Sequence, residues 1–179
     1  MAFFPAYFED IYAATKNIDE DILKTCAEAV RTTSKQGGKV IIVGNGGSAA
    51  IASHVSVDFT KAAGIRAINF NEADLLTCFS NDFGYEKWVE KAFEYYADAK
   101  DLIFIISSSG SSPNMIRGAE QAKNMGIYVI TLSGFKEANT LRTLGDVNLW
   151  VDSKKYNTVE MAHHIWLLAI VDYLIQEGI

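Results

Sequence analysis

The sequence has little of what marks several specialised classes of protein. Only two of its 179 residues are cysteine and two are proline. Cys26 and Cys78 lie far apart and match no metal-binding or redox spacing, so we expect two reduced thiols. The sequence therefore predicts neither a disulfide framework nor a cysteine-based metal centre.

Positive charge is also scarce. Sixteen Lys and Arg residues face 22 Asp and Glu residues, which gives a formal net charge of −6. No cluster of basic residues could neutralise a row of phosphates, so we expect no nucleic-acid partner. A small anionic ligand would have to be held by local hydrogen-bond donors.

Long hydrophobic runs are missing as well. The longest strongly apolar stretch, residues 165–175, is interrupted by Asp172 and is too short to span a bilayer. The first ten residues include acids and no basic segment, unlike a signal peptide. We expect a cytoplasmic protein without a membrane partner.

What the chain does contain suits one packed domain, because 49% of its residues are hydrophobic and 21% are charged. Short apolar runs alternate with amphipathic segments, a pattern that predicts a doubly wound, five-stranded parallel sheet flanked by helices, of flavodoxin-like type. The expected strands are 39–44, 66–70, 101–106, 127–132 and 147–151. The expected helices are 5–15, 19–36, 48–61, 85–97, 113–125 and 158–176.

Two loops follow strands that we expect to be buried. The first, Gly44–Ser48, has three glycines that would let a ligand approach the backbone N–H groups at a helix start. The second, Ser107–Ser112, has five hydroxyls in six residues ahead of a helix at Pro113. Ligands of open α/β sheets bind beyond the carboxyl ends of the strands, where both loops would lie.

Each loop also has an ordinary explanation. Glycine turns after strands are common, and a serine run can be a solvated turn or a helix cap. The two loops together favour a phosphate site over these alternatives. The glycine loop has neither the G-x-G-x-x-G spacing nor the Gly-Lys-Ser/Thr of nucleotide-binding loops, so we expect no nucleotide cofactor.

The segments GNGGSAA, NDFGY, SSSGSSPN and VEMAHH occur in this order. Together they resemble the sugar isomerase (SIS) domain family, and within it the phosphoheptose isomerases, which convert sedoheptulose 7-phosphate to a heptose 7-phosphate. The resemblance covers nearly the whole chain. It implies one SIS domain, residues 1–179, with N-terminal helices for oligomerisation in 1–36 and an α/β sandwich in 37–179. It also implies a homo-oligomer, a tetramer in this family.

The resemblance assigns roles to individual residues. A phosphorylated sugar, a heptose phosphate, would be the ligand. Its phosphate would be bound by Ser107, Ser108, Ser109 and Ser112. The part of the site that holds the rest of the sugar would be lined by Asn45, Gly46, Gly47, Ser48 and Asp82. Glu72 and Asp74 lie in an expected loop after the strand 66–70, either near the substrate or simply solvated.

Aldose–ketose isomerisation moves a proton between adjacent carbons through an enediol, with a base and a group that shuttles hydroxyl protons. His54 and Asp58 form an i, i+4 pair, where the family has His and Glu as zinc ligands and the Glu also as the base. On the last helix Glu160 replaces the family's zinc-binding Gln, and Leu168 replaces its zinc-binding, acid/base His.

His164 lies one turn before Leu168 and one turn after Glu160. We therefore hypothesise a rearranged site in which His54, Asp58, Glu160 and His164 hold zinc. Asp58 would be the base, with His54 and His164 also catalytic and Glu160 also contacting substrate. The alternative for the histidines is packing or solvent exposure.

Two functions follow from these residues. The first is a phosphoheptose isomerase that supplies heptose for a surface polysaccharide. The second is a non-catalytic phosphosugar-binding or regulatory SIS protein, of the type that associates with a replication initiator. Such a protein would keep both loops and lose the acid/base group, as the leucine at position 168 suggests.

Overall fold

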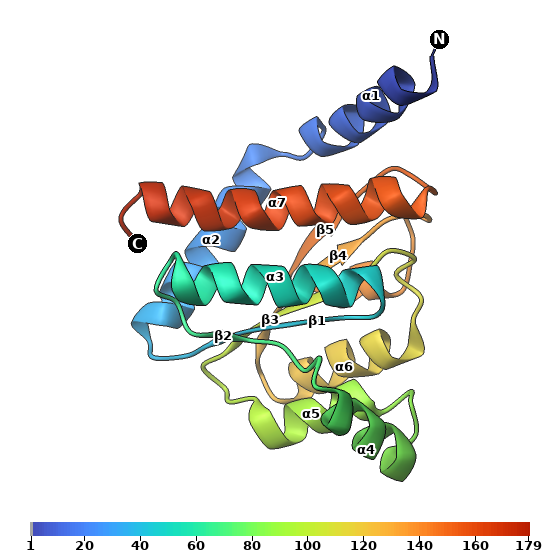
Figure 1. Ribbon diagram of the computed structural model, residues 1–179. Coiled ribbons are helices and arrows are strands. Elements are labelled where there is room, and N and C mark those ends of the chain that lie inside the picture. Colours follow the sequence, from blue (N-terminus) through green and yellow to red (C-terminus); the bar gives the residue numbers. More distant parts are fainter. Residues whose placement is uncertain (1) are drawn as a thin grey trace.

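The computed structural model describes residues 2–179 and has a five-stranded parallel sheet at its centre (Figure 1). The strand order is β2-β1-β3-β4-β5. The strands are β1 (Val40–Gly44), β2 (Ala67–Ile68), β3 (Leu102–Ser107), β4 (Tyr128–Ser133) and β5 (Val147–Trp150). The order and the parallel pairing confirm the doubly wound sheet that the sequence predicts.

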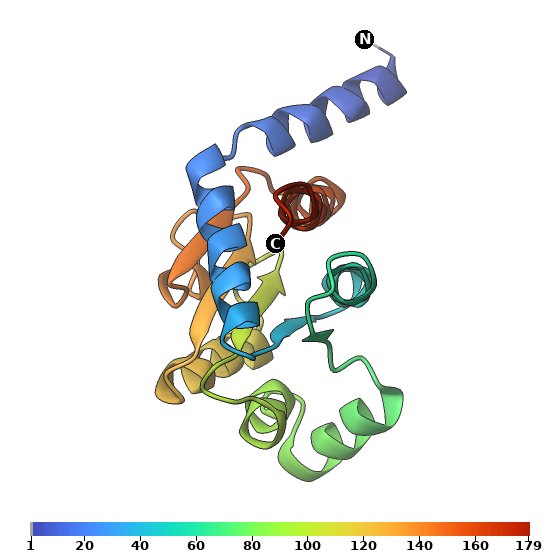
Figure 2. The ribbon, with the colours of Figure 1, turned by 90° about the vertical axis from the view of Figure 1, so that its left-hand side faces the viewer.

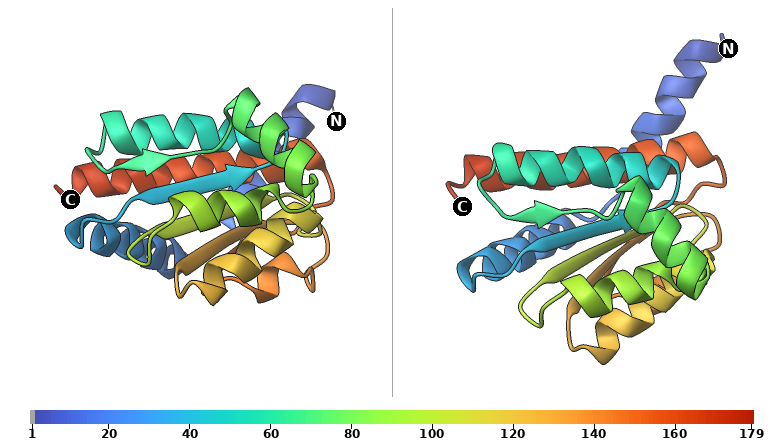
Figure 3. Two further views of the ribbon diagram at one scale, coloured as in Figure 1. Left: turned by 90° about the horizontal axis from the view of Figure 1, so that it is seen from below. Right: turned by 60° about the horizontal axis from the view of Figure 1, so that its bottom comes forward.

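Helices cover both faces of the sheet. On one face α2 (Glu20–Lys35), α3 (Gly47–Lys61) and α7 (Tyr156–Gln176) share one apolar core with the sheet. Figure 2 shows α3 and α7 end-on and side by side on this face. On the opposite face lie α4 (Ala73–Phe83), α5 (Trp88–Tyr96) and α6 (Pro113–Asn124), as both views in Figure 3 show.

Successive side chains of a strand point to opposite faces of the sheet, and this alternation explains why helices pack on both faces. Ile42 and Phe104 point into the core under α3 and α7, whereas their neighbours Ile41, Ile103 and Ile105 point into the core under α5 and α6. All five are essentially inaccessible to solvent. The central strands are apolar on both faces because both faces are covered by helices.

The first helix, α1 (Phe3–Lys16), extends away from the body of the protein and has no buried residue (Figure 1). It contacts α7, where the indole of Trp166 donates to the carbonyl of Thr15 at 2.8 Å. Its aromatic side chains face outward: Phe3 is 73% exposed and Phe8 is 63% exposed.

Two segments differ from the sequence prediction. The strand expected at 66–70 is shorter and covers only Ala67–Ile68. The strand ends there because the next residue, Asn69, donates a side-chain hydrogen bond to Ser56 Oγ of α3. The loop expected around Asp74 is the first turn of α4. This helix forms because Leu75 and Phe79 pack on the core under α5 and α6.

The last helix, α7, is long enough and apolar enough to cross a bilayer by length and composition alone, with a mean hydropathy of 1.2 over its best window. Half of that window is buried inside the protein. Its buried side chains include Trp166, Leu167 and Ile170, which complete the core above the sheet. This is the position of a core helix in a globular domain.

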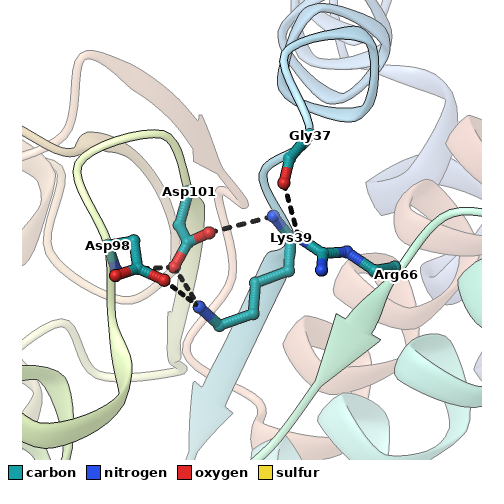
Figure 4. Close-up of polar contacts among 5 residues, drawn as sticks. All are labelled: Gly37, Lys39, Arg66, Asp98 and Asp101. Carbon is teal, nitrogen blue, oxygen red and sulfur yellow. Dashed lines mark hydrogen bonds and ion pairs between the residues drawn. The ribbon is translucent and has the colours of Figure 1, made fainter.

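A buried carboxylate joins β1 and β3 at the amino edge of the sheet (Figure 4). Asp101 is 4% exposed and accepts from the Lys39 backbone N–H at 2.9 Å and from Lys39 Nζ at 2.6 Å. It also accepts from the backbone N–H of Asp98 at 2.8 Å. Three donors on one buried group fix the start of both strands, while the Asp98 carboxylate of the same cluster is exposed.

We expect Asp101→Ala to lower the free energy of unfolding by about 3–5 kcal/mol, because it leaves the lysine charge and two N–H groups without their buried partner. Chemical denaturation at neutral pH measures this. Asp98→Ala is the matched control, and removing this exposed partner of Lys39 should cost no more than about 1 kcal/mol. Equal effects of the two substitutions would contradict this role for Asp101.

Candidate active site

The glycine loop (Gly44–Ser48) and the serine loop (Ser107–Ser112) lie side by side at the carboxyl edge of the sheet. Strands β1 and β3 are neighbours, and Gly44 pairs with Ile106 in their register. Asn45 and Asn114 exchange two side-chain hydrogen bonds, at 3.0 and 2.9 Å. The two loops predicted from the sequence therefore open on the same side of the protein.

Tyr85 adds a third group to this junction. Its hydroxyl donates to Asn45 Oδ1 at 3.1 Å. Neither Tyr85 nor Asn114 is among the predicted site residues, although both lie within the motifs NDFGY and SSSGSSPN. The pairing of Asn45 with Asn114 could not be read from the sequence, because 69 residues separate them.

Four of the five hydroxyls of the serine loop take part in hydrogen bonds within the loop, and that of Ser108 does not. Ser107 and Ser108 are 5% and 6% exposed, and Ser109 and Ser112 are half-buried. Ser107 Oγ donates to Ser112 Oγ at 3.2 Å. Ser108 Oγ is buried and has no hydrogen-bond partner among the described residues. A buried hydroxyl is normally paired, so this one is a ready donor for an anion at the start of α6.

Asn139 packs against the serine loop and is not among the site residues predicted from the sequence. It is 4% exposed and donates to Ser133 Oγ at 3.0 Å. Its side chain lies against Gly110, whose φ is +63°, and a Cβ at position 110 would come within 2.8 Å of the Asn139 Cβ. Leu141 N donates to the carbonyl of Gly110 at 3.0 Å. These contacts hold the serine loop in its turn.

Glu160 lies against the glycine loop. A methyl group at position 47 would be 2.6 Å from Glu160 Cδ and 2.7 Å from Oε1, so a side chain at position 47 would displace this carboxylate. Gly46, with φ of +55°, begins the turn into α3, and Ser48 is buried in its first turn. The structure thus places Glu160 with the predicted glycine-loop residues.

Three side chains in contact link α3 to α7, by one ion-pair contact and one hydrogen bond. His54 Nε2 lies 3.3 Å from Asp58 Oδ2, and His54 Nδ1 lies 2.8 Å from His164 Nε2. The two rings meet edge to face, with centroids 4.9 Å apart. Burial lowers the pKa of His164, and the neighbouring His54 lowers it further. The structure therefore brings together three predicted residues, His54, Asp58 and His164.

The arrangement of the His54 and His164 nitrogens does not fit a zinc site. Two nitrogens bound to one zinc at about 2.0–2.1 Å in tetrahedral geometry would be about 3.3 Å apart. The nitrogens of His54 and His164 are at hydrogen-bond distance instead. Among residues 2–179, no group of three or more His, Cys, Asp and Glu side chains is arranged to hold a metal. Zinc binding stays a prediction.

Asp82 is not brought to the two loops by any hydrogen bond of the described chain. It is exposed near the end of α4, where Cys78 donates to it at a sulfur–oxygen distance of 3.7 Å and Asn81 Nδ2 donates at 2.8 Å. It lines a cavity of about 450 Å³ with Phe79 and Tyr95. Its role at the sugar stays a prediction.

The residues next to His164 on α7 have structural positions. His163 is fully buried, and its Nε2 donates to the carbonyl of Ser133 at 3.1 Å, while its Nδ1 has no partner. Burial lowers the pKa of His163 from 6.5 to about 4, so the ring is neutral at neutral pH. Leu168 packs against the core under α3 and α7. Neither side chain contacts Asp58, His54 or His164 through a hydrogen bond or ion pair of the described residues.

Comparison with known proteins identifies relatives along most of the chain. Residues 4–134 match the SIS domain family. The phosphoheptose isomerase of Haemophilus ducreyi is 33% identical over 169 residues, covering 92% of this chain and 86% of its own length. That of Cytophaga hutchinsonii is 30% identical over 165 residues, covering 89% and 86%. The structure of phosphoheptose isomerase GmhA from Neisseria gonorrhoeae superposes with a TM-score of 0.87 at 26% identity, covering 95% and 96%.

We expect the stability of the protein to fall as the pH drops from about 6.5 to about 4, because of His163. The unfolded chain takes up the proton at the ordinary pKa of 6.5, whereas the buried ring resists it until about 4. Stability is therefore complete above 6.5 and declines below it, by about 3 kcal/mol over the window at 1.36 kcal/mol per pH unit.

Denaturation curves of the wild type and of His163→Gln at pH 7 and pH 4.5 measure this difference. The glutamine amide can still donate to the Ser133 carbonyl but does not titrate, so the variant should lose less stability on acidification. An equal loss in the two proteins would contradict the assignment to His163.

We expect Ser108→Ala to weaken phosphosugar binding by about 1–3 kcal/mol without lowering the melting temperature, because its hydroxyl has no protein partner to lose. Titration calorimetry and thermal unfolding measure the two effects. Ser111→Ala, at an exposed residue of the same loop, is the control and should leave the affinity unchanged. An unchanged affinity in Ser108→Ala would place the phosphate elsewhere.

Proposed function

Because this chain belongs to the SIS domain family, and within it to the branch of the phosphoheptose isomerases, we propose that it is an aldose–ketose isomerase that converts sedoheptulose 7-phosphate to D-glycero-D-manno-heptose 7-phosphate. The single observation that carries the proposal is the junction of the two loops through Asn45 and Asn114. It joins an anion site rich in hydroxyls to a neighbouring set of carboxylates and imidazoles.

The serine loop accounts for the phosphate end of the substrate. It offers a buried, unpaired hydroxyl on Ser108 and the N-terminal end of α6, whose N–H groups and dipole favour an anion. No lysine or arginine is needed there. The glycine loop faces the other end of the sugar, because the carboxylate of Glu160 beside Gly47 would repel a phosphate.

The isomerisation needs two kinds of proton transfer. One group moves a proton between the two carbons, and another serves the two oxygens as the enediol forms and collapses. The sequence assigns the first role to Asp58 and the second to His54 and His164. The contacts among Asp58, His54 and His164 support an acid/base function at this place in the fold.

The regulatory alternative rests on the leucine at position 168. It is not favoured, because the curated relatives bear the name of an enzyme and because a titratable imidazole, His164, stands one turn away on the same helix. Loss of the histidine expected at 168 therefore leaves an acid/base group close by.

We also propose that the protein is a cytoplasmic homo-oligomer, a tetramer, assembled through its N-terminal helices. The aromatic side chains of α1 support this, because Phe3, Phe4, Phe8 and Tyr12 are each more than half exposed on a helix without a buried residue. The heptose phosphate that the protein produces would enter the synthesis of lipopolysaccharide or a capsule.

We expect the purified protein to convert sedoheptulose 7-phosphate to the aldose, measured by NMR of the sugar protons, and to do so without added zinc. A metal-free sample prepared with a chelator and a sample with added zinc are run in parallel. Activity only with added zinc would confirm the zinc prediction. Retained binding without turnover in either sample would overturn the isomerase and favour the regulatory alternative.

A further inference from the structure

The backbone of the serine loop has carbonyl groups that are paired and N–H groups that are not. Its four consecutive carbonyls in residues 107–110 each accept a hydrogen bond from within the protein. Two of them are paired inside the loop: the carbonyl of Ser107 accepts from Gly110 N–H at 2.9 Å, and that of Ser109 accepts from the Ser111 hydroxyl at 3.2 Å. The other two are paired with residues outside the loop.

The N–H groups at this place are the opposite case. Among residues 2–179, no backbone carbonyl accepts from the N–H groups of Ser108, Ser109, Ser112 and Asn114. The two ends of a peptide dipole carry opposite partial charges, so an anion is attracted by unpaired N–H groups and repelled by unpaired carbonyl oxygens. The serine loop therefore offers a phosphate its donors, while the acceptors of residues 107–110 are occupied elsewhere.

The segment that follows β4, residues 134–141, occupies the two remaining carbonyls. Gly134 N–H donates to the carbonyl of Ser108 at 2.9 Å, and Leu141 N–H donates to the carbonyl of Gly110 at 3.0 Å. The side chain of Leu141 is fully buried in the core under α5 and α6. The two ends of this segment hold the serine loop, so the loop depends on the shape of the segment between them.

Asn139 fixes the shape of residues 134–141. Its amide nitrogen donates to the Ser133 hydroxyl at 3.0 Å and to the carbonyl of Lys136 at 2.9 Å. Its amide oxygen accepts from Arg142 N–H at 3.0 Å. The side chain is 4% exposed, so water has little access to replace these bonds. One buried amide thus holds the chain on both sides of the segment.

Asn139 also contacts the serine loop directly. A Cβ at position 110 would lie 2.8 Å from the Asn139 Cβ. Gly110 has a φ of +63°, a left-handed conformation that glycine adopts without strain. The turn that leaves the N–H groups of Ser108 and Ser109 unpaired closes at Gly110. The Asn139 side chain therefore lies against the residue that ends this turn.

We propose that Asn139 is a positioning residue for the phosphate: through residues 134–141 and its contact with Gly110, it keeps the loop carbonyls paired and the loop N–H groups free for the anion. The inference rests on the proposed phosphosugar ligand of this site. It assigns a residue that the sequence prediction did not include. Asn139 acts on the phosphate end of the sugar and takes no part in the proton transfers.

The test compares Asn139→Ala with a matched control, Asn148→Ala. Asn148 is a partly buried asparagine on β5 that donates to the carbonyl of Gly145 at 3.2 Å, and no hydrogen bond of the described residues joins it to the serine loop. Both substitutions should lower the melting temperature, because each removes hydrogen bonds of the folded protein. Only Asn139→Ala should weaken the binding of inorganic phosphate, by about 10–100-fold, the effect of losing a hydrogen bond to a charged group.

Titration calorimetry at constant ionic strength measures the binding of inorganic phosphate and of sedoheptulose 7-phosphate. In turnover of the sugar, Asn139→Ala should raise KM and leave kcat nearly unchanged, because the phosphate end is bound alike in the ground state and the transition state. Should Asn139→Ala fail to fold, Asn139→Ser, which keeps one donor, is measured in its place with the same expected direction.

A double-mutant cycle with Gly110→Ala tests the contact itself. The added methyl group would collide with the Asn139 side chain, whereas an alanine at position 139 leaves it more room. Gly110→Ala should therefore weaken phosphate binding less in Asn139→Ala than in the unmodified protein, and the backbone strain at position 110 cancels in the cycle. Additive effects would contradict the contact.

The remaining outcomes separate this inference from the proposed function. Unchanged phosphate affinity in Asn139→Ala would overturn the inference alone, as would an equal loss of affinity in Asn148→Ala. Phosphate binding that depends on Asn139, in a protein that does not turn over the sugar, would overturn the isomerase and support the inference. Absence of binding of either ligand to the unmodified protein would overturn both.

Discussion

The adjacency of β1 and β3 in a parallel sheet is the constraint on which the site depends. Parallel neighbours end at the same edge, so the loops that follow them must emerge together. The Asn45–Asn114 pair then fixes the distance between the loops, and α7 crosses above them to add Glu160 and His164. Residues from four separate parts of the chain meet because the sheet brings their backbones to one edge.

The same edge separates two electrostatic tasks. In the proposed site, anion binding would fall to neutral donors, with Ser108 as the clearest case, in a protein whose net charge is −6. The neighbouring glycine loop also leads into a helix, but a carboxylate lies over it. On the proposed site this arrangement would give the substrate one direction, since a dianionic phosphate would be attracted at one loop and repelled at the other.

The fold and the two loops could be predicted because their signals are local. Runs such as KVIIVG and DLIFII show strands buried on both faces, and the glycines and serines stand directly after them. The helix α4 was missed, although Leu75, Leu76 and Phe79 lie at helical spacing, because Glu72 and Asp74 at its start were interpreted as a loop. Strand β2 was predicted too long because side-chain bonds from Asn69 end it, and propensity does not report such bonds.

The parts of the site that depend on distant contacts could not be predicted. Nothing near Asn139 in the sequence points to its contact with Gly110. Glu160 was predicted at the substrate only through the family resemblance, because nothing near Gly47 points to a residue 113 positions away. The adjacent histidines show the same limit. His163 and His164 are neighbours in the sequence, but the helix directs one into the core and the other toward His54.

The buried pair of Asp101 and Lys39 ties the opposite, amino edge of the two strands that carry the loops. Rigidity is thereby supplied at one end of β1 and β3 and chemistry at the other, with four or five residues of strand between them. Substitutions in the loops that change which substrate binds can therefore accumulate without weakening the Asp101–Lys39 pair. A scaffold of this kind is open to new sugars at little risk to its folding.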